Sequence, residues 1–323
     1  MSILRIKMYL LLGVLFAVIY AVITVIGAYM GIANFYFYLI LSLGIMFVQY
    51  MVGPKIVEWS MKVKYVEKNQ YPELFKMVED LARKAGIPTP KIGISPAAIP
   101  NAFAFGKNPA DGRVCVTSAI VSLLNKDELK AVLGHEISHI KNRDVLTITL
   151  LSVIPLILYR VAWHFLWFGG RRRNGGGNVA LIGVAAFLFY FLTNLLVLYG
   201  SRIREYFADK GSIELGNKPS TLASALYKLV YGSARMNKQA LKNVEGVKAF
   251  FVNDPSQAVN EIRQLKQLDI DQNGTIDPEE LKILQTRNVK LNFGDKVMEI
   301  LSTHPNMLKR IKHLSSLQET KVS

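Results

Sequence analysis

The sequence His-Glu-Ile-Ser-His at residues 135–139 places two histidines four positions apart, with a glutamate after the first. Positions i and i+4 of a helix lie on one face, so His135 and His139 can present two imidazole nitrogens to one metal ion. Glu136 would then lie beside that ion, where its carboxylate can accept a proton from a water molecule. This is the two-histidine zinc motif of metalloproteases. A long chain can contain this pattern by chance, so the surrounding sequence is needed to distinguish a zinc site from a chance match.

The composition predicts a membrane protein, since 51% of the 323 residues are hydrophobic. Four apolar runs account for the excess, at residues 8–31, 34–53, 145–168 and 179–200. Each is long enough to cross a hydrocarbon layer about 30 Å thick. The first run follows Arg5 and Lys7, but it is too long for a signal peptide and no small-residue cleavage site comes after it. We therefore expect a retained anchor and four membrane spans.

The net charge of +15 favours contact with anionic lipid on the cytoplasmic side. Nucleic acid is disfavoured as a partner because the sequence has no recognition helix or RNA-binding signature. Arg5 and Lys7 place the N-terminus inside the cell, and four spans then place residues 54–144 and the C-terminal third inside as well. The basic residues 171–173 would fall outside, against the positive-inside rule. Either this hairpin is an exception or its tip is not fully translocated.

A polar segment lies between the second and third apolar runs. Residues 71–86 show helical periodicity and end at a glycine. Residues 91–95 and 112–118 alternate like short strands, with residues 101–106 between them. Residues 126–144 are expected to form the helix that carries the histidine pair, and no breaker separates them from the third apolar run. Cys115, within the second strand-like run, is expected to be a small buried residue rather than a nucleophile.

Glu205 follows directly on the fourth apolar run. A catalytic zinc site uses three protein ligands and leaves one position open. An antiparallel pair of spans would return Glu205 to the height of His135 and His139, about 10 Å above the membrane boundary at 1.5 Å per helical residue. Glu205 is therefore the predicted third ligand. The alternative is a solvated carboxylate that flanks the span.

These residues resemble the HtpX-type membrane metalloproteases, relatives of the Ste24 prenyl-protein peptidases. The resemblance is carried by residues 80–88, 100–106, 127–129, 135–144, 204–209 and 302–311. It implies a mainly α integral membrane protein with four transmembrane helices and a cytoplasmic zincin-like α+β protease domain. The expected parts are a two-helix anchor (1–54), the first part of the protease domain (55–144), a transmembrane hairpin (145–201) and the second part of the protease domain (202–323).

The resemblance also implies roles for single residues. One Zn²⁺ per chain would be held by His135, His139 and Glu205, with Glu136 as the base that takes a proton from water and passes it to the departing amine. Asp209, one turn after Glu205, and Arg310 would support the ligands. The stretch that lies beside bound substrate would comprise Asn101, Ala102, Phe103 and Ala104.

The oxyanion of the reaction needs a further hydrogen-bond donor. His304, Arg310 and Tyr206 are the available candidates, and His304 comes first because the family motif includes it. A structural histidine beside a helix-starting proline is the alternative for His304. Arg204 and Arg310 could simply pair with Asp209 or other carboxylates.

Residues 269–280 depart from the family pattern and fit a twelve-residue calcium loop. Gly274 supplies the sharp turn at the sixth position and Ile276 the apolar eighth position. The predicted Ca²⁺ ligands are Asp269, Asp271, Asn273, the carbonyl of Thr275, Asp277 and Glu280. The alternative is an acidic surface loop that binds nothing, since the sequence offers no second loop to pair with it. We expect calcium to order residues 255–290 and to alter substrate access or self-association.

The leading function is a zinc endopeptidase that cleaves misfolded or damaged membrane proteins in the cell membrane, with its active site facing the cytoplasm. A prenyl-protein peptidase is one alternative, but that group has more spans. A calcium-responsive membrane scaffold with a vestigial zinc site is the other. Every catalytic position holds a chemically competent residue, which favours an enzyme.

Overall fold

The computed structural model describes residues 35–144, 176–236, 257–287 and 292–318, with residue 252 and a few positions between 155 and 166. Two compact units divide the chain. One comprises residues 1–52 and 146–203, and the other comprises residues 53–145 and 204–323. The first predicted span, most of the third and the tip at residues 171–173 lie outside the described residues.

Two long helices pass from the first unit into the second. Helix α2 (Phe35–Ser60) covers the second apolar run and continues past Gly53, and helix α7 (Gly176–Glu214) covers the fourth. Among the described residues, one helical stretch is long and apolar enough to cross a membrane, at Leu181–Glu214. The presence of four membrane spans and the cytoplasmic orientation of the protease domain therefore stay predictions.

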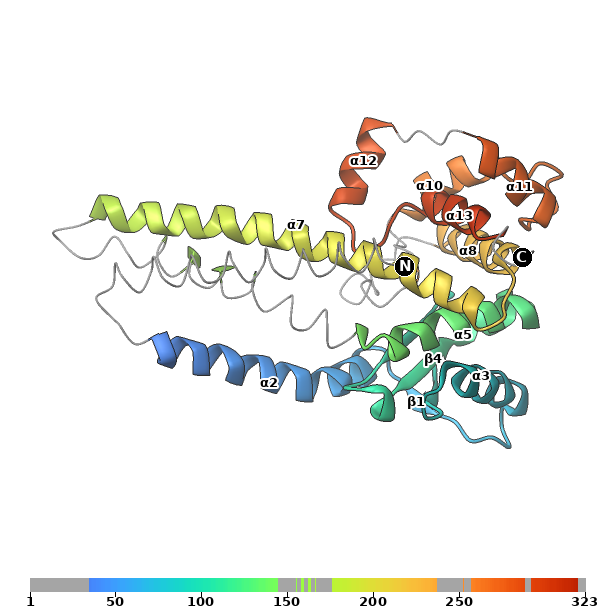
Figure 1. Cartoon of the computed structure of the whole chain (residues 1–323), viewed down its shortest axis with the longest axis horizontal. Coiled ribbons are helices and arrows are strands. Elements are labelled where there is room, and N and C mark those ends of the chain that lie inside the picture. Colours follow the sequence, from blue (N-terminus) through green and yellow to red (C-terminus); the bar gives the residue numbers. More distant parts are fainter. Residues whose placement is uncertain are drawn as a thin grey trace. The chain divides into compact units, whose positions relative to one another are not determined.

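A four-stranded sheet lies in the second unit (Figure 1). Its strands are β1 (Lys64–Tyr65), β2 (Lys91–Ser95), β3 (Ala102–Phe105) and β4 (Arg113–Thr117), in the spatial order β1-β2-β4-β3. Strands β2 and β4 are parallel, and the outer strands pair antiparallel with them. The predicted strands at 91–95 and 112–118 match β2 and β4. Strand β3 is an addition, and it forms one edge of the sheet.

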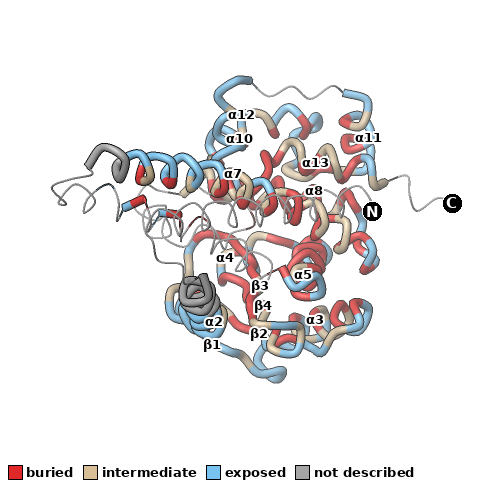
Figure 2. The backbone as a smooth tube through the Cα atoms, turned by 60° about the vertical axis from the view of Figure 1, so that its left-hand side comes forward, coloured by how far each residue is buried: buried red, intermediate tan, exposed pale blue. Residues whose placement is uncertain are grey.

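Helices cover this sheet and build most of the second unit. In chain order they are α3 (Pro72–Ala85), α4 (Ser118–Leu123), α5 (Lys126–Lys141), α8 (Pro219–Ala234), α10 (Ala258–Leu265), α11 (Pro278–Thr286), α12 (Phe293–Ile300) and α13 (Met307–Ser316). The prediction of a helix over residues 71–86 holds for α3, which Gly86 ends in the left-handed conformation with φ of 70°. Buried residues concentrate in α5, in α8 and in strands β3 and β4 (Figure 2).

Helix α5 has a well-defined start and an earlier end than the sequence predicts. Asn125 caps its first turn, and Glu128 completes a reciprocal capping box. The helix ends at Lys141, and Arg143 has a φ of 56°, a left-handed backbone conformation that stops a right-handed helix. The expectation of an unbroken helix through residue 144 into the third apolar run was therefore wrong.

Candidate active site

His135 and His139 lie one turn apart on α5 and point their rings toward the same place. Their Nε2 atoms are 3.1 Å from each other. The side chain of His135 is 2% exposed and that of His139 is 15% exposed. Helical spacing alone produces this convergence, as the sequence predicts.

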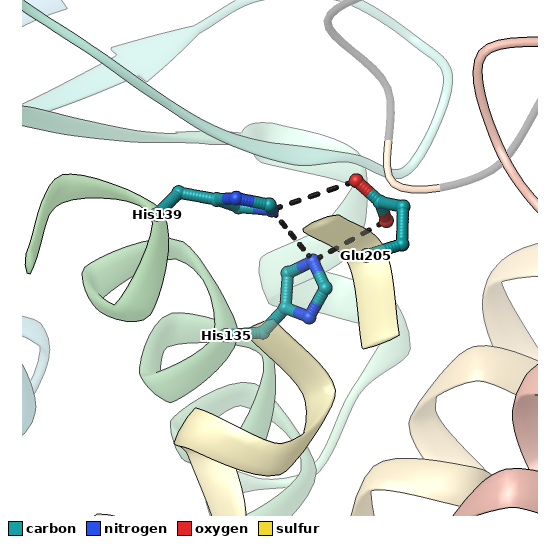
Figure 3. A group of neighbouring side chains, drawn as sticks. All are labelled: His135, His139 and Glu205. Carbon is teal, nitrogen blue, oxygen red and sulfur yellow. Dashed lines mark hydrogen bonds and ion pairs between the residues drawn. The ribbon is translucent and has the colours of Figure 1, made fainter. Parts of the chain in front are cut away.

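Glu205 reaches the histidines from the C-terminal part of α7 (Figure 3). Oε2 of Glu205 lies 3.5 Å from Nε2 of His135, and Oε1 lies 3.6 Å from Nε2 of His139. Close packing between α7 and α5 brings them together. Gly211 has no side chain, and a Cβ atom there would collide with Ser138 on α5. The hydroxyl of Ser212 donates a hydrogen bond to the carbonyl of Ala131 at 2.7 Å.

The three side chains fit a zinc ion. In a tetrahedral site with zinc bonds of about 2.0–2.2 Å, neighbouring ligand atoms lie about 3.3–3.5 Å apart. The three distances between ligand atoms here, 3.1, 3.5 and 3.6 Å, bracket that value. Two imidazoles and one carboxylate are also the donor set of a catalytic zinc site with one open position.

Each histidine has a carboxylate behind it. Nδ1 of His135 lies 2.9 Å from Oδ1 of Asp209, and Nδ1 of His139 lies 2.5 Å from Oδ2 of Asp144. When Nδ1 donates its proton to the carboxylate, Nε2 keeps its lone pair for a metal ion. The two carboxylates therefore fix both the ring orientation and the tautomer that metal binding requires.

Each of these two carboxylates forms an ion pair with an arginine. Arg310 is fully buried, and its Nε and Nη2 lie 3.0 and 2.6 Å from the two oxygens of Asp209. Its Nη1 lies 3.1 Å from Oε2 of Glu205 and also donates to the carbonyl of Val252 at 2.8 Å. Nε of Arg204 lies 3.0 Å from Oδ1 of Asp144. Buried carboxylates are costly without such partners, so the arginines allow three of them to lie around one centre.

The electrostatics of the site follow from this arrangement. Burial alone would lower the pKa of His135, but the carboxylates of Asp209 and Glu205 raise it to about 10. Burial likewise opposes the charge of Arg310, and Asp209 and Glu205 outweigh it and raise the pKa of the guanidinium. The carboxylates of Asp209 and Glu205 thus favour a positive charge at the position of His135, which a proton or a divalent cation can supply.

Glu136 is 4% exposed and lies next to the ligand pair on α5. Burial raises the pKa of its carboxyl group, whereas the imidazoles of His135 and His139 and a backbone hydrogen bond from Ala104 act in the opposite direction. A raised carboxyl pKa suits a group that must both accept and return a proton near neutral pH. The contact with Ala104 also ties Glu136 to the edge strand β3.

The predicted substrate residues lie on or beside β3, with their side chains turned into the protein. Ala102 and Phe103 are buried, and Ala104 is half-buried. Oδ1 of Asn101 accepts a hydrogen bond from the backbone N–H of Val252 at 2.9 Å, which gives this residue a structural role. Within the described residues β3 pairs with β4 alone, so its other edge faces no further strand.

His304 lies at the site, whereas the other oxyanion candidates are engaged elsewhere. Nδ1 of His304 is 3.5 Å from Oε2 of Glu205, and within the described residues neither ring nitrogen makes a hydrogen bond. Tyr206 packs its ring edge-on against His313, with the ring centroids 5.1 Å apart. Arg310 is committed to Asp209 and Glu205.

The predicted calcium ligands form a second group, in which Asp269, Asp271 and Glu280 converge.

Asp144 lies five residues after His139, and Arg204 directly precedes Glu205. The sequence predicts no role for Asp144 beyond its place in the motif, whereas pairing of Arg204 with a carboxylate is one of the alternatives given above, and the structure supplies Asp144 as that carboxylate. Their positions next to predicted ligands were the available signal. The missing information was the turn at Asn142 and Arg143, which brings the Asp144 carboxylate back to His139.

A two-histidine, one-glutamate centre with an adjacent buried glutamate defines the class as a metalloprotease. Residues 68–318 match Peptidase family M48. The chain is 50% identical over 227 residues to "Protease HtpX homolog" of Methanothermobacter thermautotrophicus, covering 70% of this chain and 86% of that one. It is 34% identical over 277 residues to the HtpX homologue of Moorella thermoacetica, covering 84% and 81%. The chain belongs to Peptidase family M48 and is a membrane metalloprotease.

A solved structure shows a related fold. The crystal structure of S. mikatae Ste24p superposes with a TM-score of 0.50 at 18% identity, covering 97% of this chain and 67% of that one. The resemblance to the HtpX and Ste24 group is thus confirmed by family, relatives and fold.

Proposed function

We propose that the chain is a zinc-dependent endopeptidase that cleaves misfolded or damaged membrane proteins. One zinc ion would be held by His135, His139 and Glu205. The convergence of these three side chains at 3.1–3.6 Å is the observation that supports the proposal most strongly. When bound, the metal would supply Lewis acidity that activates a water molecule and polarises the peptide carbonyl.

The residues of the chain would carry the remaining steps. Glu136 would accept a proton from the attacking water and then deliver it to the departing amine. His304, whose ring nitrogens make no hydrogen bond to any residue that the structure describes, would donate to the oxyanion that develops on the carbonyl. Asp209 and Asp144 would hold the imidazoles in place, while Arg310 and Arg204 hold the carboxylates.

An extended substrate would bind along β3. An edge strand has unpaired backbone groups, and a peptide can add to it as a further strand. Ala104 lies on β3 and its backbone contacts Glu136, so a peptide on this edge would pass close to the proton acceptor. Recognition through the backbone suits substrates that are unfolded rather than defined by one sequence.

The proposed setting is the cell membrane, with four spans and the active site on the cytoplasmic side. The apolar stretch at Leu181–Glu214, in the helix that carries Glu205, supports a site close to the bilayer. The positions of Arg5 and Lys7 before the first apolar run support the orientation. Substrates would then arrive along or from the membrane.

The variant Glu136→Gln tests this function. We expect the purified variant to keep one zinc ion per chain and to lose cleavage of casein and of an unfolded membrane protein. Persistent cleavage would remove Glu136 from its role. A wild-type protein that binds zinc but cleaves neither substrate would favour the scaffold, and cleavage of a prenylated peptide alone would favour the prenyl-protein peptidase.

A further inference from the structure

Residues 269–280 lie outside the zinc site and have the ligand pattern of a calcium loop. The carboxylates of Asp269, Asp271 and Glu280 each place an oxygen within 4.8 Å of the others. Gly274 adopts a φ of 81° at the turn, and Ile276 is 2% exposed in the core of the second unit. Both features match the roles of the sixth and eighth positions in such a loop.

Buried oxygen atoms without donors point to a cation in this loop. Asp269 is only 6% exposed. Its Oδ2 accepts hydrogen bonds from the hydroxyl of Tyr227 and the backbone N–H of Gly274, both at 3.0 Å, but its buried Oδ1 has no hydrogen-bond partner among the described residues. Within the same part of the chain, the buried Oδ1 of Asp277 also has none. A buried carboxylate oxygen without a donor is costly, and a bound cation removes the cost.

The loop is built into the protease unit rather than attached to it. Its flanking helices α10 and α11 pack against α8 and α13. Six apolar residues of the loop and its flanking helices are buried in the same core as the rest of the unit, namely Ala258, Leu265, Leu268, Ile276, Leu281 and Leu284. The hydroxyl of Tyr227 on α8 donates a hydrogen bond to Oδ2 of Asp269, which ties the loop to α8.

Helix α13 connects this segment to the zinc site. The carboxylate of Glu261 on α10 accepts a hydrogen bond from the backbone N–H of Met307 at 3.0 Å, at the start of α13. Lys312 on α13 donates to the carbonyl of Arg287 at the end of α11. Between these two attachments lies Arg310, which holds Glu205 and Asp209. Helices α10 and α11 are therefore bonded directly to the helix whose Arg310 supports two parts of the zinc centre.

We propose that residues 269–280 bind one calcium ion, and that the bound ion fixes α10 and α11 so that α13 holds Arg310 against Glu205 and Asp209. The first half of the proposal stands on the loop alone. The second half rests on the proposed zinc site. Calcium would therefore strengthen zinc retention without taking part in the reaction.

Isothermal titration of full-length, zinc-loaded protein in detergent with calcium chloride tests the first half. We expect one site per chain with a Kd between about 10⁻⁷ and 10⁻³ M. Asp271→Asn should weaken binding at least about tenfold, because it removes the charge of a proposed ligand that is exposed. Asp271 accepts hydrogen bonds from the backbone N–H and the side-chain amide of Asn273, and the asparagine oxygen can still accept one of them. Glu279→Gln is the matched control, since it removes the same charge from an exposed position that is not a ligand.

The result that overturns this half is a Kd weaker than about 10⁻³ M in the wild type. Equal weakening by Asp271→Asn and Glu279→Gln would also overturn it, because general attraction to negative charge would then explain the heat. Glu280→Gln is a second ligand variant. Its side chain also accepts from the backbone N–H groups of Ile270 and Asp277, so its fold must be checked by circular dichroism.

The rate of zinc transfer to a zinc-selective chromogenic chelator tests the second half. At a calcium concentration about three times the wild-type Kd, zinc release should slow about twofold or more in the wild type and in Glu279→Gln, and much less in Asp271→Asn, whose loop would then be mostly empty. Calcium binding without any change in zinc release would overturn the coupling. Neither calcium titration nor zinc release depends on peptidase activity. A failure of the proposed function would therefore appear in the cleavage assay and not in these two measurements.

Discussion

Nδ1 of His135 lies 2.9 Å from Oδ1 of Asp209, and the same carboxylate is held by Arg310 from its other side. A parallel chain runs from His139 to Asp144 to Arg204. Each of the two histidines thus contacts its own carboxylate, and each carboxylate contacts its own arginine. This duplication explains how four charged side chains can be buried behind one metal centre.

The carboxylates that orient the histidines should control zinc affinity. We expect Asp209→Asn and Asp144→Asn each to weaken zinc binding about 10- to 100-fold, because the amide is a poorer acceptor and leaves the imidazole less basic. Competition against a chelator of known zinc affinity measures this. Asp127→Asn is the control, since Asp127 is exposed on the first turn of α5. An unchanged affinity in both variants would show that the carboxylates only fill space.

Arg310 should contribute to stability as well as to the site. Arg310→Met would leave Asp209 and Glu205 buried without a cation, and we expect the free energy of unfolding to fall by about 3–5 kcal/mol. Arg310→Lys keeps the charge but not the two-pronged contact, so its loss should be smaller. Thermal unfolding in detergent, monitored by tryptophan fluorescence, measures the melting temperatures. We expect the wild type to be the most stable protein, followed by Arg310→Lys and then Arg310→Met. A melting temperature of Arg310→Met equal to that of the wild type would contradict the account.

Gly211 should matter for zinc binding although it lies six residues beyond Glu205 in the sequence. A Cβ atom at Gly211 would collide with Ser138 on α5, so Gly211→Ala should push α7 away and move Glu205 from the histidines. We expect less than one zinc ion per chain after dialysis. Adding Ser138→Gly should restore zinc content, since it removes the colliding atoms. Failure of this second change to restore zinc would argue that Gly211→Ala acts in another way.

His304 should act in the reaction rather than in metal binding. We expect His304→Ala to keep its zinc ion and to lose about 10²- to 10³-fold in kcat, the usual cost of removing one donor to an oxyanion. The measurement pairs zinc content with kcat on an unfolded protein substrate. Loss of zinc with loss of activity would instead make His304 a ligand or a structural residue beside Glu205.

The local parts of this site can be predicted from the sequence because they depend on spacing along one element. Helical periodicity places His135 and His139 together, and the alternation of residues 91–95 predicts β2. Gly274 and its neighbours in the calcium loop are likewise a short, position-dependent pattern. The prediction of Glu205 as the third ligand depends on an antiparallel pair of membrane spans. The structure places Glu205 beside the two histidines.

The parts that the sequence could not provide depend on contacts between distant segments. Strand β3 forms because residues 102–105 pair with β4, and four residues alone carry too weak a pattern to show this. In an unbroken helix, Asp144 would point about 140° away from His139, because each residue turns by 100°. The left-handed residue Arg143 breaks the helix and reverses that geometry, and the composition of the segment gives no sign of it.

The position of the metal ion tests the central claim most directly. Crystals of the zinc-loaded protein, measured at the zinc absorption edge, would give an anomalous map that locates the ion without reference to activity. We expect one peak per protease unit, about 2.0–2.2 Å from Nε2 of His135, Nε2 of His139 and a carboxylate oxygen of Glu205. A zinc peak elsewhere in the chain, or one bound by the two histidines without Glu205, would contradict it.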